Sequence, residues 1–430
     1  MTTVGRVADL GRSTMSEGVG AKDLLARLLA VPTADRAKAL AHDLSRMSLL
    51  RPTADIEHFA ALAAERRWDE AFRAAPPARV PSEAGALRTM LDAIRAGGRD
   101  PRLAAALSRL VEEEGAGGVA GGLYLVACAV SGIPVTAAGS PRAWLASLGA
   151  IMDECEPDLL FRIPALLPPS MHADGMLSVL SDMAARLPPA VPGDAFLHRP
   201  HMPVQLAPAA DAVSERLLVC VCGRQGRLGM PVNVFHRWAA GASAHVLYLR
   251  ALDDAGYDDG IPAVGAGFTV LATFVQDVAG ALGVKHVGVY GSSMGAFPGL
   301  RLGLAVGARR IVSAGGIAIE VRPGSRTVPT PGERAEARNS LRRELEPALR
   351  AVAGCTEVLC LYARGHAFDR ADAMILSGLP GVRSAGVPQT FHNVGRHLAT
   401  TGTLGPLLAW TAGARADLDG LSIDEQDSAG

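Results

Sequence analysis

The sequence predicts an α/β fold, in which a mostly parallel sheet of about six strands is flanked by helices and follows an all-α N-terminal domain. Two observations predict it. Residues 21–187 show helical periodicity with almost no strands, whereas in residues 215–413 short apolar runs alternate with helical segments. This alternation indicates βαβ units, which place helices on both faces of a parallel sheet. A proline-rich stretch, residues 188–214, separates the two parts and is interpreted as a linker.

Composition supports a globular chain with sizeable cores. The 430 residues are 49% hydrophobic and 20% charged, which suits two or three packed domains. Residues 1–20 are polar and glycine-rich and are predicted to form a flexible tail, and residues 414–430 an acidic tail. The formal net charge is −1 and no basic stripe is present, which argues against a nucleic-acid partner.

Export and membrane insertion find no support in the sequence. The first twenty residues lack the apolar core of a signal peptide. The most apolar window, residues 121–135, is interrupted by Gly132 and Pro134 and is too short for a membrane span of roughly 20 residues. The six cysteines lack metal-ligand spacing and are interpreted as buried thiols in a reducing compartment. We therefore expect a cytoplasmic protein with no membrane partner, no metal and no cofactor.

The first part is predicted to be an irregular helical bundle. Leucines recur at helical spacing, and Asp100 and Ser140 each precede a proline, which is typical of a helix start. Residues 65–71 faintly resemble the second helix of a tetratricopeptide pair, but no repeat period follows. After residues 21–47, helices are predicted at residues 54–64, 68–74, 82–96, 101–114, 119–130, 142–154 and 174–187.

The second part is an ordered series of strands and helices. Strands are predicted at residues 216–222, 245–250, 287–290, 310–313, 357–363 and 382–391, with residues 202–206 as a further candidate. Helices are predicted at residues 231–240, 265–282, 296–304, 333–352, 371–379 and 398–412. Parallel sheets bind ligands at the carboxyl ends of their strands, so the residues that follow each strand are the place to look for a site.

A G-x-S-x-G pattern, formed by Gly291, Ser293 and Gly295, lies between the strand at 287–290 and the next helix. A tight strand–turn–helix holds the serine hydroxyl clear of the sheet, and small residues are needed where the two backbones approach. In a chain with 48 glycines such a pattern also arises by chance, so the interpretation depends on its position between strand and helix. Ser293 is the candidate nucleophile.

A serine nucleophile needs a histidine as general base and a carboxylate that orients the histidine. Asp369 and Asp372 follow the next-to-last strand, and His392 and His397 follow the last one. We prefer His392 as the base because it lies in the loop before the final helix. Asp369 is the preferred acid, although it also fits a helix cap, and Asp372 is the alternative. His366 precedes the helix and is given no role.

The tetrahedral intermediate of acyl transfer requires backbone donors. One is expected from the N–H of Met294, which follows the nucleophile, and another from Arg224 or Gln225 in the glycine-rich loop at residues 223–229. A phosphate cradle is the rival interpretation of this loop, but the Lys-Ser/Thr pair of a Walker motif is missing.

Together, the turn, the Ser–Asp–His order and the succession of strands make residues 215–413 similar to the α/β-hydrolase superfamily. The resemblance implies a triad of Ser293, His392 and Asp369. Two departures stand out: the antiparallel pair that usually begins the sheet is replaced by the proline-rich stretch, and the insertion that usually carries a lid is short, at residues 315–347. We therefore expect a trimmed sheet, and substrate recognition that falls partly to the helical part.

The expected function is that of an esterase- or thioesterase-like serine hydrolase, acting on an ester, thioester or amide through an acyl-enzyme. An acyltransferase of the same mechanism, and a helical interaction protein with a degenerate hydrolase domain, are the alternatives. The expected partner is a small-molecule or acylated substrate, and the sequence leaves open whether the protein forms a homo-oligomer. Arg250, at a strand end, is a candidate for binding an anionic substrate group, unless it pairs with Asp253 or Asp254.

Overall fold

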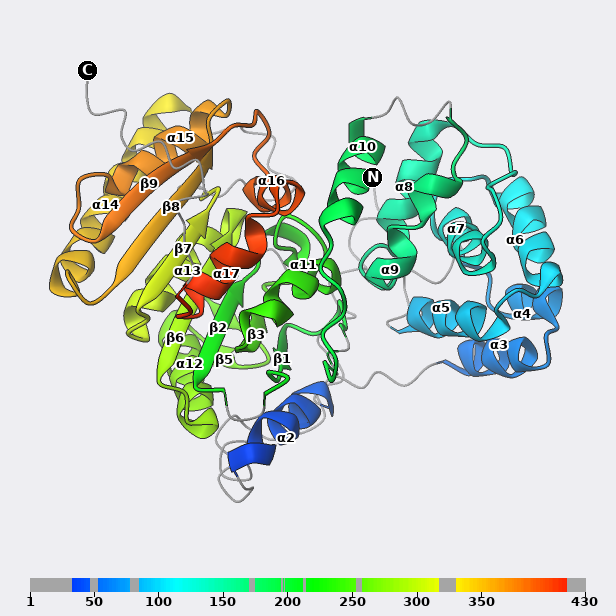
Figure 1. The fold of residues 1–430 in the computed structure, drawn as a ribbon, viewed down its shortest axis with the longest axis horizontal. Helices are drawn as coiled ribbons and strands as arrows, with labels where there is room; N and C mark the ends of the chain where they lie inside the picture. Colours follow the sequence, from blue (N-terminus) through cyan, green and yellow to red (C-terminus); the bar gives the residue numbers. More distant parts are fainter. Residues whose placement is uncertain are drawn as a thin grey trace, which may run out of the picture.

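The computed structural model describes residues 33–46, 53–77, 85–169, 175–194, 196, 198–211, 214–252, 257–316 and 330–415. The predicted N-terminal tail lies outside these residues, as does all of the predicted acidic tail after residue 415. Within the described residues, a seven-stranded sheet and its covering helices lie beside a separate group of helices (Figure 1).

The large sheet is mostly parallel and has the order β1-β3-β2-β6-β7-β8-β9. Only its edge strand β1 is antiparallel to its neighbour, β3. The α/β class predicted from the alternating pattern is therefore confirmed, and β1 falls within the proline-rich stretch at the candidate strand. The strands are β1 (Val204–Ala207), β2 (Arg216–Val221), β3 (His245–Leu249), β6 (His286–Ser292), β7 (Arg310–Ala314), β8 (Glu357–Ala363) and β9 (Val382–Val387); β4 (Gly260–Ile261) and β5 (Gly265–Ala266) form a small separate hairpin.

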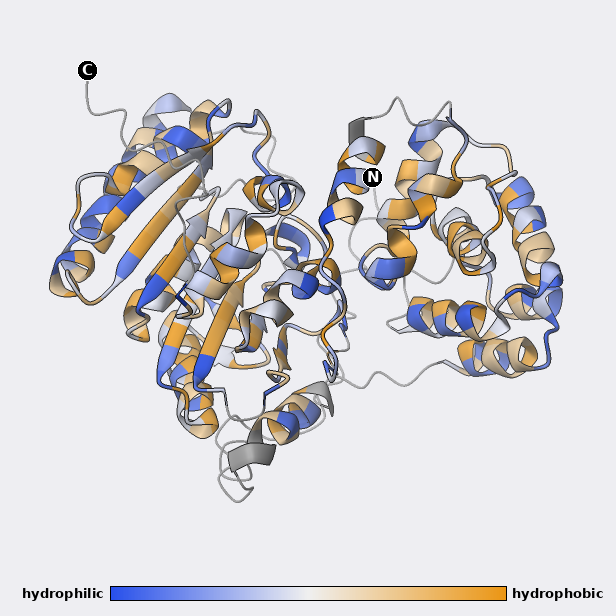
Figure 2. Ribbon diagram, viewed as in Figure 1, coloured by the Kyte–Doolittle hydropathy of each residue, from blue (hydrophilic) through white to orange (hydrophobic). Residues whose placement is uncertain are grey.

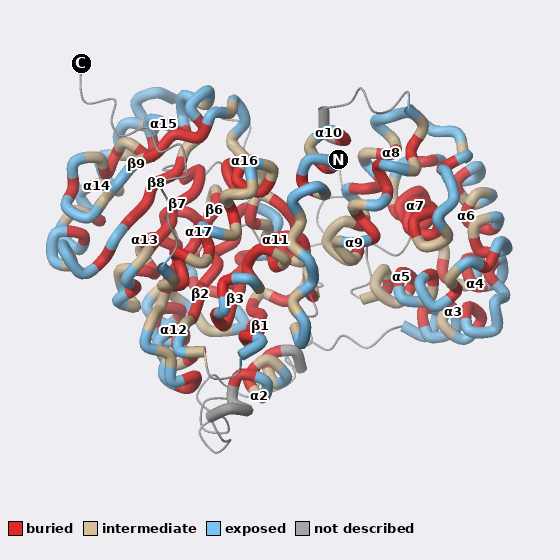
Figure 3. The backbone as a smooth tube through the Cα atoms, viewed as in Figure 1, coloured by how far each residue is buried: buried red, intermediate tan, exposed pale blue. Residues whose placement is uncertain are grey.

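Both faces of the large sheet are buried, because side chains of a strand alternate between its two sides. In β2, Leu218 and Cys220 contribute to one hydrophobic core, and Leu217 and Val219 to the other. Figure 2 shows hydrophobic colouring along β2 and β8, and Figure 3 shows the central strands buried along their length. Near-continuous apolar strands of this kind are what a parallel sheet covered on both sides requires.

The helices that follow β2 and β6 lie on opposite faces of the sheet. On the first face are α11 (Val232–Ala239), α16 (Val394–Thr401) and α17 (Leu404–Thr411). On the second are α12 (Phe268–Leu282), α13 (Ala296–Ala305), α14 (Pro331–Ala351) and α15 (Ala367–Ala373). The chain thus reverses its winding between the neighbouring strands β2 and β6, and parallel sheets bind ligands at the carboxyl ends of the strands at such a switch point.

The helical group packs around α7, of which eleven residues are buried. Its hydrophobic core is continuous with the first face of the sheet. The helices are α3 (Ala54–Ala64), α4 (Trp68–Ala74), α5 (Ala86–Gly97), α6 (Pro101–Glu114), α7 (Val119–Ser131), α8 (Pro141–Ile151), α9 (Pro157–Leu160) and α10 (Gly175–Arg186). None of the helices within the described residues is long and apolar enough to cross a membrane.

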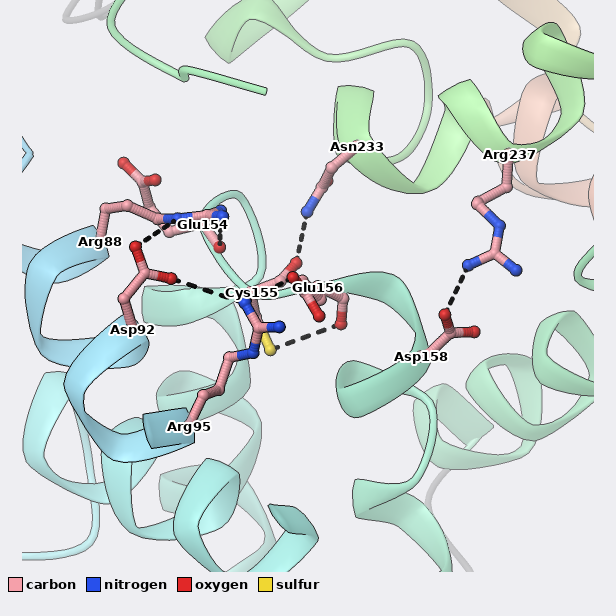
Figure 4. Close-up of polar contacts among 9 residues, drawn as sticks. All are labelled: Arg88, Asp92, Arg95, Glu154, Cys155, Glu156, Asp158, Asn233 and Arg237. Carbon is pink, nitrogen blue, oxygen red and sulfur yellow. Dashed lines mark hydrogen bonds and ion pairs between the residues drawn. The ribbon is translucent and has the colours of Figure 1, made fainter. Parts of the chain in front are cut away.

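Polar contacts join the helical group to α11 (Figure 4). The Asn233 amide donates to the carbonyl oxygens of Met152, at 3.2 Å, and Cys155, at 2.5 Å. The Arg237 guanidinium pairs with Asp158 at 2.8 Å and also donates to the carbonyl of Pro188. Side chain-to-backbone bonds of this kind hold the two groups of elements in a defined orientation.

Some boundaries differ from the predicted ones. The helix α2 (Thr33–Arg46) was grouped with the helical part, but its Leu40 and Leu44 pack into the second core of the sheet, near β1 and α12. The predicted final helix is two helices, because Gly402 adopts a left-handed φ of 80° that ends α16. The helix expected at 371–379 begins earlier, at Ala367, with His366 as its N-cap.

Tyr257 joins the carboxyl ends of the neighbouring strands β2 and β3. Its buried hydroxyl lies 2.8 Å from the carbonyl oxygen of Cys222 and 2.9 Å from that of Leu249. Replacing it with phenylalanine leaves the Cys222 carbonyl without this donor, so we expect Tyr257→Phe to lower the free energy of unfolding by about 1–3 kcal/mol in urea titrations. The control is Tyr362→Phe, since Tyr362 is only half-buried. Equal stability of both variants would contradict the role of the Tyr257 hydroxyl.

Candidate active site

Ser293 lies in the sharp turn between β6 and α13, in the short 3-10 helix η6 (Ser293–Gly295). Its φ is 54°, a left-handed value that costs energy for a residue with a side chain. The turn is this tight because backbones approach closely. A Cβ on Gly295 would lie 2.4 Å from the carbonyl oxygens of Val221 and Cys222, and one on Gly291 would lie 2.3 Å from the carbonyl oxygen of Gly295. The strained serine that the G-x-S-x-G pattern predicts is therefore present.

A chain of hydrogen bonds leads from this serine to a buried carboxylate. Ser293 Oγ lies 2.8 Å from His392 Nε2, and His392 Nδ1 lies 2.7 Å from Asp369 Oδ1. An ionised carboxylate accepts only, so His392 carries its proton on Nδ1 and presents an unprotonated Nε2 to the serine hydroxyl. The Asp369 side chain is 2% exposed, whereas that of His392 is 32% exposed. The structure thus brings together three residues that are far apart in the sequence; their part in catalysis stays a prediction.

The loop that carries His392 is fixed from two sides. Asn393 accepts a hydrogen bond from the Arg396 N–H as the N-cap of α16, and its amide donates to the carbonyl oxygen of Gly229 in the loop after β2. Beneath the ring lies Gly315, at the end of β7, where an added Cβ would approach the His392 carbonyl oxygen to 3.1 Å. Neither residue was predicted from the sequence. Asn393 could have been found as a cap residue before a helix, and Gly315 as the first of two glycines after a strand.

Gly223, at the start of the loop after β2, packs closely against Ser292 and Ser293. A Cβ on Gly223 would lie 2.7 Å from the Ser292 carbonyl oxygen and 3.0 Å from Ser293 Cβ. The short 3-10 helix η4 (Arg224–Gly226) follows, in which Gln225 has a φ of 60°. N–H groups in the first turn of a helix have no acceptor within it, which applies to Met294 in η6 and to Gln225 in η4. The loop is thus suited to donate N–H groups beside Ser293.

The alternative acid has another partner, and the alternative base lies further along α16. Asp372 is buried and pairs with Arg338 of α14 at 2.6 Å. His397 lies further along α16, where burial lowers the pKa of its imidazole.

Arg250 lies inside the protein. Its side chain is 1% exposed and donates to the carbonyl oxygens of Arg199 and Pro200 and to Gln205 Oε1. The anionic substrate contact expected from the sequence is therefore replaced by a link between β3 and the segment before β1, and burial lowers the pKa of the guanidinium. The alternative partners, Asp253 and Asp254, lie outside the described residues.

His366 was given no role by the sequence analysis but joins the site. Its Nδ1 lies 2.7 Å from Asp369 Oδ1, as close as that of His392. His366, Asp369 and His392 each offer one possible metal-ligand atom, and these atoms all lie within 4.8 Å of one another, a spacing that a metal ion could use. Hydrogen bonds join His392 to the Asp369 carboxylate and the Asp369 N–H to His366 Nδ1. The signal in the sequence was a second histidine three residues before the acid.

A small cavity lies within the helical group. Its volume is about 10 Å³, which is room for about one water molecule, and its polar lining is paired: Arg88 donates to Asp92, and Arg95 pairs with Glu156 at 2.6 Å (Figure 4). Burial raises the pKa of Glu154, which also lines it, to about 7. The side chains of Asp92, Arg95 and Glu156 are 52%, 41% and 40% exposed, so these ion pairs lie at the surface.

Comparisons with known proteins add little beyond this geometry. No family model matches the chain, and no curated protein matches it. Among solved structures, TT1662 from Thermus thermophilus is similar at 16% identity over 49% of this chain and 94% of that chain, with a TM-score of 0.32. A TM-score of this size supports no assignment.

The tight turn can be tested at Gly295. An alanine there would bring its Cβ into the carbonyl oxygens of Val221 and Cys222, so we expect Gly295→Ala to destabilise the fold by more than about 3 kcal/mol, or to prevent folding. The matched control is Gly280→Ala on α12, where an added Cβ meets nothing within 4 Å. Better helix propensity should make that variant as stable as the wild type or up to about 1 kcal/mol more stable. Thermal melts of both variants check this, and a wild-type melt for Gly295→Ala would refute the close approach.

Proposed function

We propose that this protein is a serine hydrolase of the α/β-hydrolase type that cleaves an ester, thioester or amide through an acyl-enzyme. The observation that carries the proposal is the hydrogen-bonded chain Ser293–His392–Asp369 at distances of 2.8 and 2.7 Å. Further support comes from the strained φ of the serine and from its place at the switch point of a parallel sheet.

In the proposed mechanism, Ser293 Oγ forms a bond to the acyl carbon while its proton moves to His392 Nε2. The negative charge of Asp369 stabilises the imidazolium that results. When the tetrahedral intermediate collapses, the bond to the leaving group breaks, and the leaving group takes the proton from His392. Water then attacks the acyl-enzyme with the same histidine as base, which releases the acid and restores Ser293. With another acceptor in place of water, the same steps give acyl transfer.

The oxyanion of the intermediate would be held by backbone N–H groups. The candidates are Met294 in η6 and Arg224 or Gln225 in η4, since both turns lie beside the serine. The loss of one such donor typically costs about 10²–10³-fold in rate, so the geometry of this loop matters for catalysis.

The helical group is proposed to help hold that loop. Arg227, directly after η4, forms a bidentate pair with Asp153 of the helical group, with Nε at 3.1 and 3.2 Å from its two oxygens. Both side chains are largely buried, so this pair is screened less than a surface pair. In this way the helical part would influence substrate recognition, as expected from the short lid.

An apolar acyl group is the proposed substrate moiety. Large exposed apolar side chains are few among the described residues, and three of them follow strand ends beside the site: Phe391, Phe368 and Leu252, which are 77%, 51% and 42% exposed. Phe391 immediately precedes His392, and Phe368 immediately precedes Asp369. Leu252 lies against the loop after β2, because a Cβ on Gly226 would approach its Cδ2 to 3.1 Å.

The mechanism predicts how individual substitutions change labelling by a fluorophosphonate probe and the rate of p-nitrophenyl acetate hydrolysis. Ser293→Ala should abolish labelling, and His392→Ala and Asp369→Asn should each slow hydrolysis by about 10⁴-fold. Asp372→Asn is the matched control, because Asp372 pairs with Arg338, and its activity should stay within a few-fold of wild type. Folded wild-type protein that is not labelled would instead favour the interaction protein with a degenerate hydrolase domain.

The proposed preference for an apolar acyl group can be tested with esters of different acyl chain length. Phe391→Ser should lower kcat/KM for p-nitrophenyl octanoate by about tenfold, since the lost apolar contact is worth about 1–2 kcal/mol, and should leave the acetate nearly unchanged. The control is Ile133→Ser, an exposed apolar residue in the helical group. Equal losses for both esters in Phe391→Ser would count against an acyl chain on this surface.

A further inference from the structure

Two imidazoles share one carboxylate oxygen in this site. Asp369 Oδ1 lies 2.7 Å from Nδ1 of His392 and 2.7 Å from Nδ1 of His366. Its second oxygen, Oδ2, is buried and has no hydrogen-bond partner among the described residues. A buried carboxylate must be compensated by hydrogen bonds or charges. His392 supplies one hydrogen bond at Oδ1, and His366 lies within donor distance of the same atom.

Two neighbours compete for the Nδ1 of His366. Besides Asp369 Oδ1 at 2.7 Å, the backbone N–H of Asp369 lies 3.3 Å away, as in an N-cap of α15. A neutral imidazole nitrogen either donates or accepts, and cannot do both. The contact to the carboxylate is shorter and charge-assisted, and an unprotonated Nδ1 at 2.7 Å from an anionic oxygen would be repulsive. With its proton on Nδ1, His366 would donate to Asp369 Oδ1 and give up the cap bond that it accepts from the Asp369 N–H.

We propose that His366 is a positioning residue that holds the carboxylate of Asp369 in the orientation His392 requires. This inference rests on the proposed function of Ser293 and His392. The terminal torsion of an aspartate has a broad energy minimum, and Oδ2 offers no bond that would hold it. The second imidazole N–H at Oδ1 supplies this restraint.

His366 is itself held in place. Its backbone N–H donates to the Ala363 carbonyl oxygen at 3.0 Å, at the end of β8. Its ring meets the Phe368 ring in a T-shaped contact with centroids 6.1 Å apart, and the Arg334 guanidinium covers Phe368 at 4.2 Å. A histidine fixed by its backbone and by ring packing can restrain a neighbour, whereas a freely rotating side chain could not.

The competing explanation is that His366 only caps α15. Asparagine and serine are both good N-caps, so either should preserve the helix start. They differ in reach: the amide nitrogen of asparagine occupies the position of Nδ1 and can donate to Asp369, whereas the serine hydroxyl is one bond shorter. The pair His366→Asn and His366→Ser therefore separates capping from positioning.

The first test measures the rate at which a fluorophosphonate probe labels Ser293 in the full-length protein. We expect His366→Ser to label about 10- to 100-fold more slowly, as for a displaced reacting group, and His366→Asn to stay within about threefold of wild type. Both variants should melt at the wild-type temperature. Equal labelling rates for wild type and His366→Ser, with unchanged stability, would overturn the proposal.

The second test does not depend on turnover. In protein with ¹⁵N-labelled histidine, the nitrogen shifts of His366 should report a proton on Nδ1, and its N–H proton should appear at low field beside that of His392. Asp369→Asn should move both proton signals upfield, and His366→Asn should remove one. A His366 protonated on Nε2 alone would overturn the inference. If Ser293 does not react in wild type, the proposed function fails, whereas the ¹⁵N result still decides whether the His366 bond exists.

Discussion

The close approach of two backbones at the switch point of the sheet is the constraint on which the site depends. A Cβ on Gly295 would lie 2.4 Å from the carbonyl oxygens of Val221 and Cys222, at the end of β2. Strand β6 can therefore turn into α13 directly against β2 only with glycine at this point. The turn forces Ser293 to a φ of 54° and brings the loop that begins at Gly223 against it. Ser293 and the loop beside it are thus placed by one packing contact.

Two hydrophobic cores make this contact rigid. The strands are buried on both faces, and α11 and α13 pack on opposite sides of the sheet. Helices on both sides leave the carboxyl ends of β2 and β6 as the opening, since the winding reverses there. The first core continues into the helical group, which also reaches the loop after β2 through the Arg227–Asp153 pair. The helical group is therefore mechanically connected to the loop beside Ser293.

The buried carboxylate of Asp369 links chemistry to stability. A charge that is 2% exposed requires compensation, and both contacts at Oδ1 come from imidazoles on loops after β8 and β9. Asp372, three residues on, is satisfied by an arginine of α14 instead. Two aspartates on the same short helix thus have different partners because α15 presents one to the strand ends and the other to a neighbouring helix.

The sequence by itself determined the α/β class, the order of the strands along the chain, and the turn at Ser293, because hydrophobic periodicity and glycine spacing are local properties. It also indicated Asp369 and His392 as the residues after the last two strands. Only the tertiary structure decided that Asp369 rather than Asp372 meets His392, that His366 shares the same oxygen, and that Arg250 is buried. The first outcome joins residues more than twenty positions apart, and all three depend on the side from which neighbouring elements approach, which no local pattern encodes. The same holds for α2, whose apolar stripe predicts a helix but cannot say which core it joins.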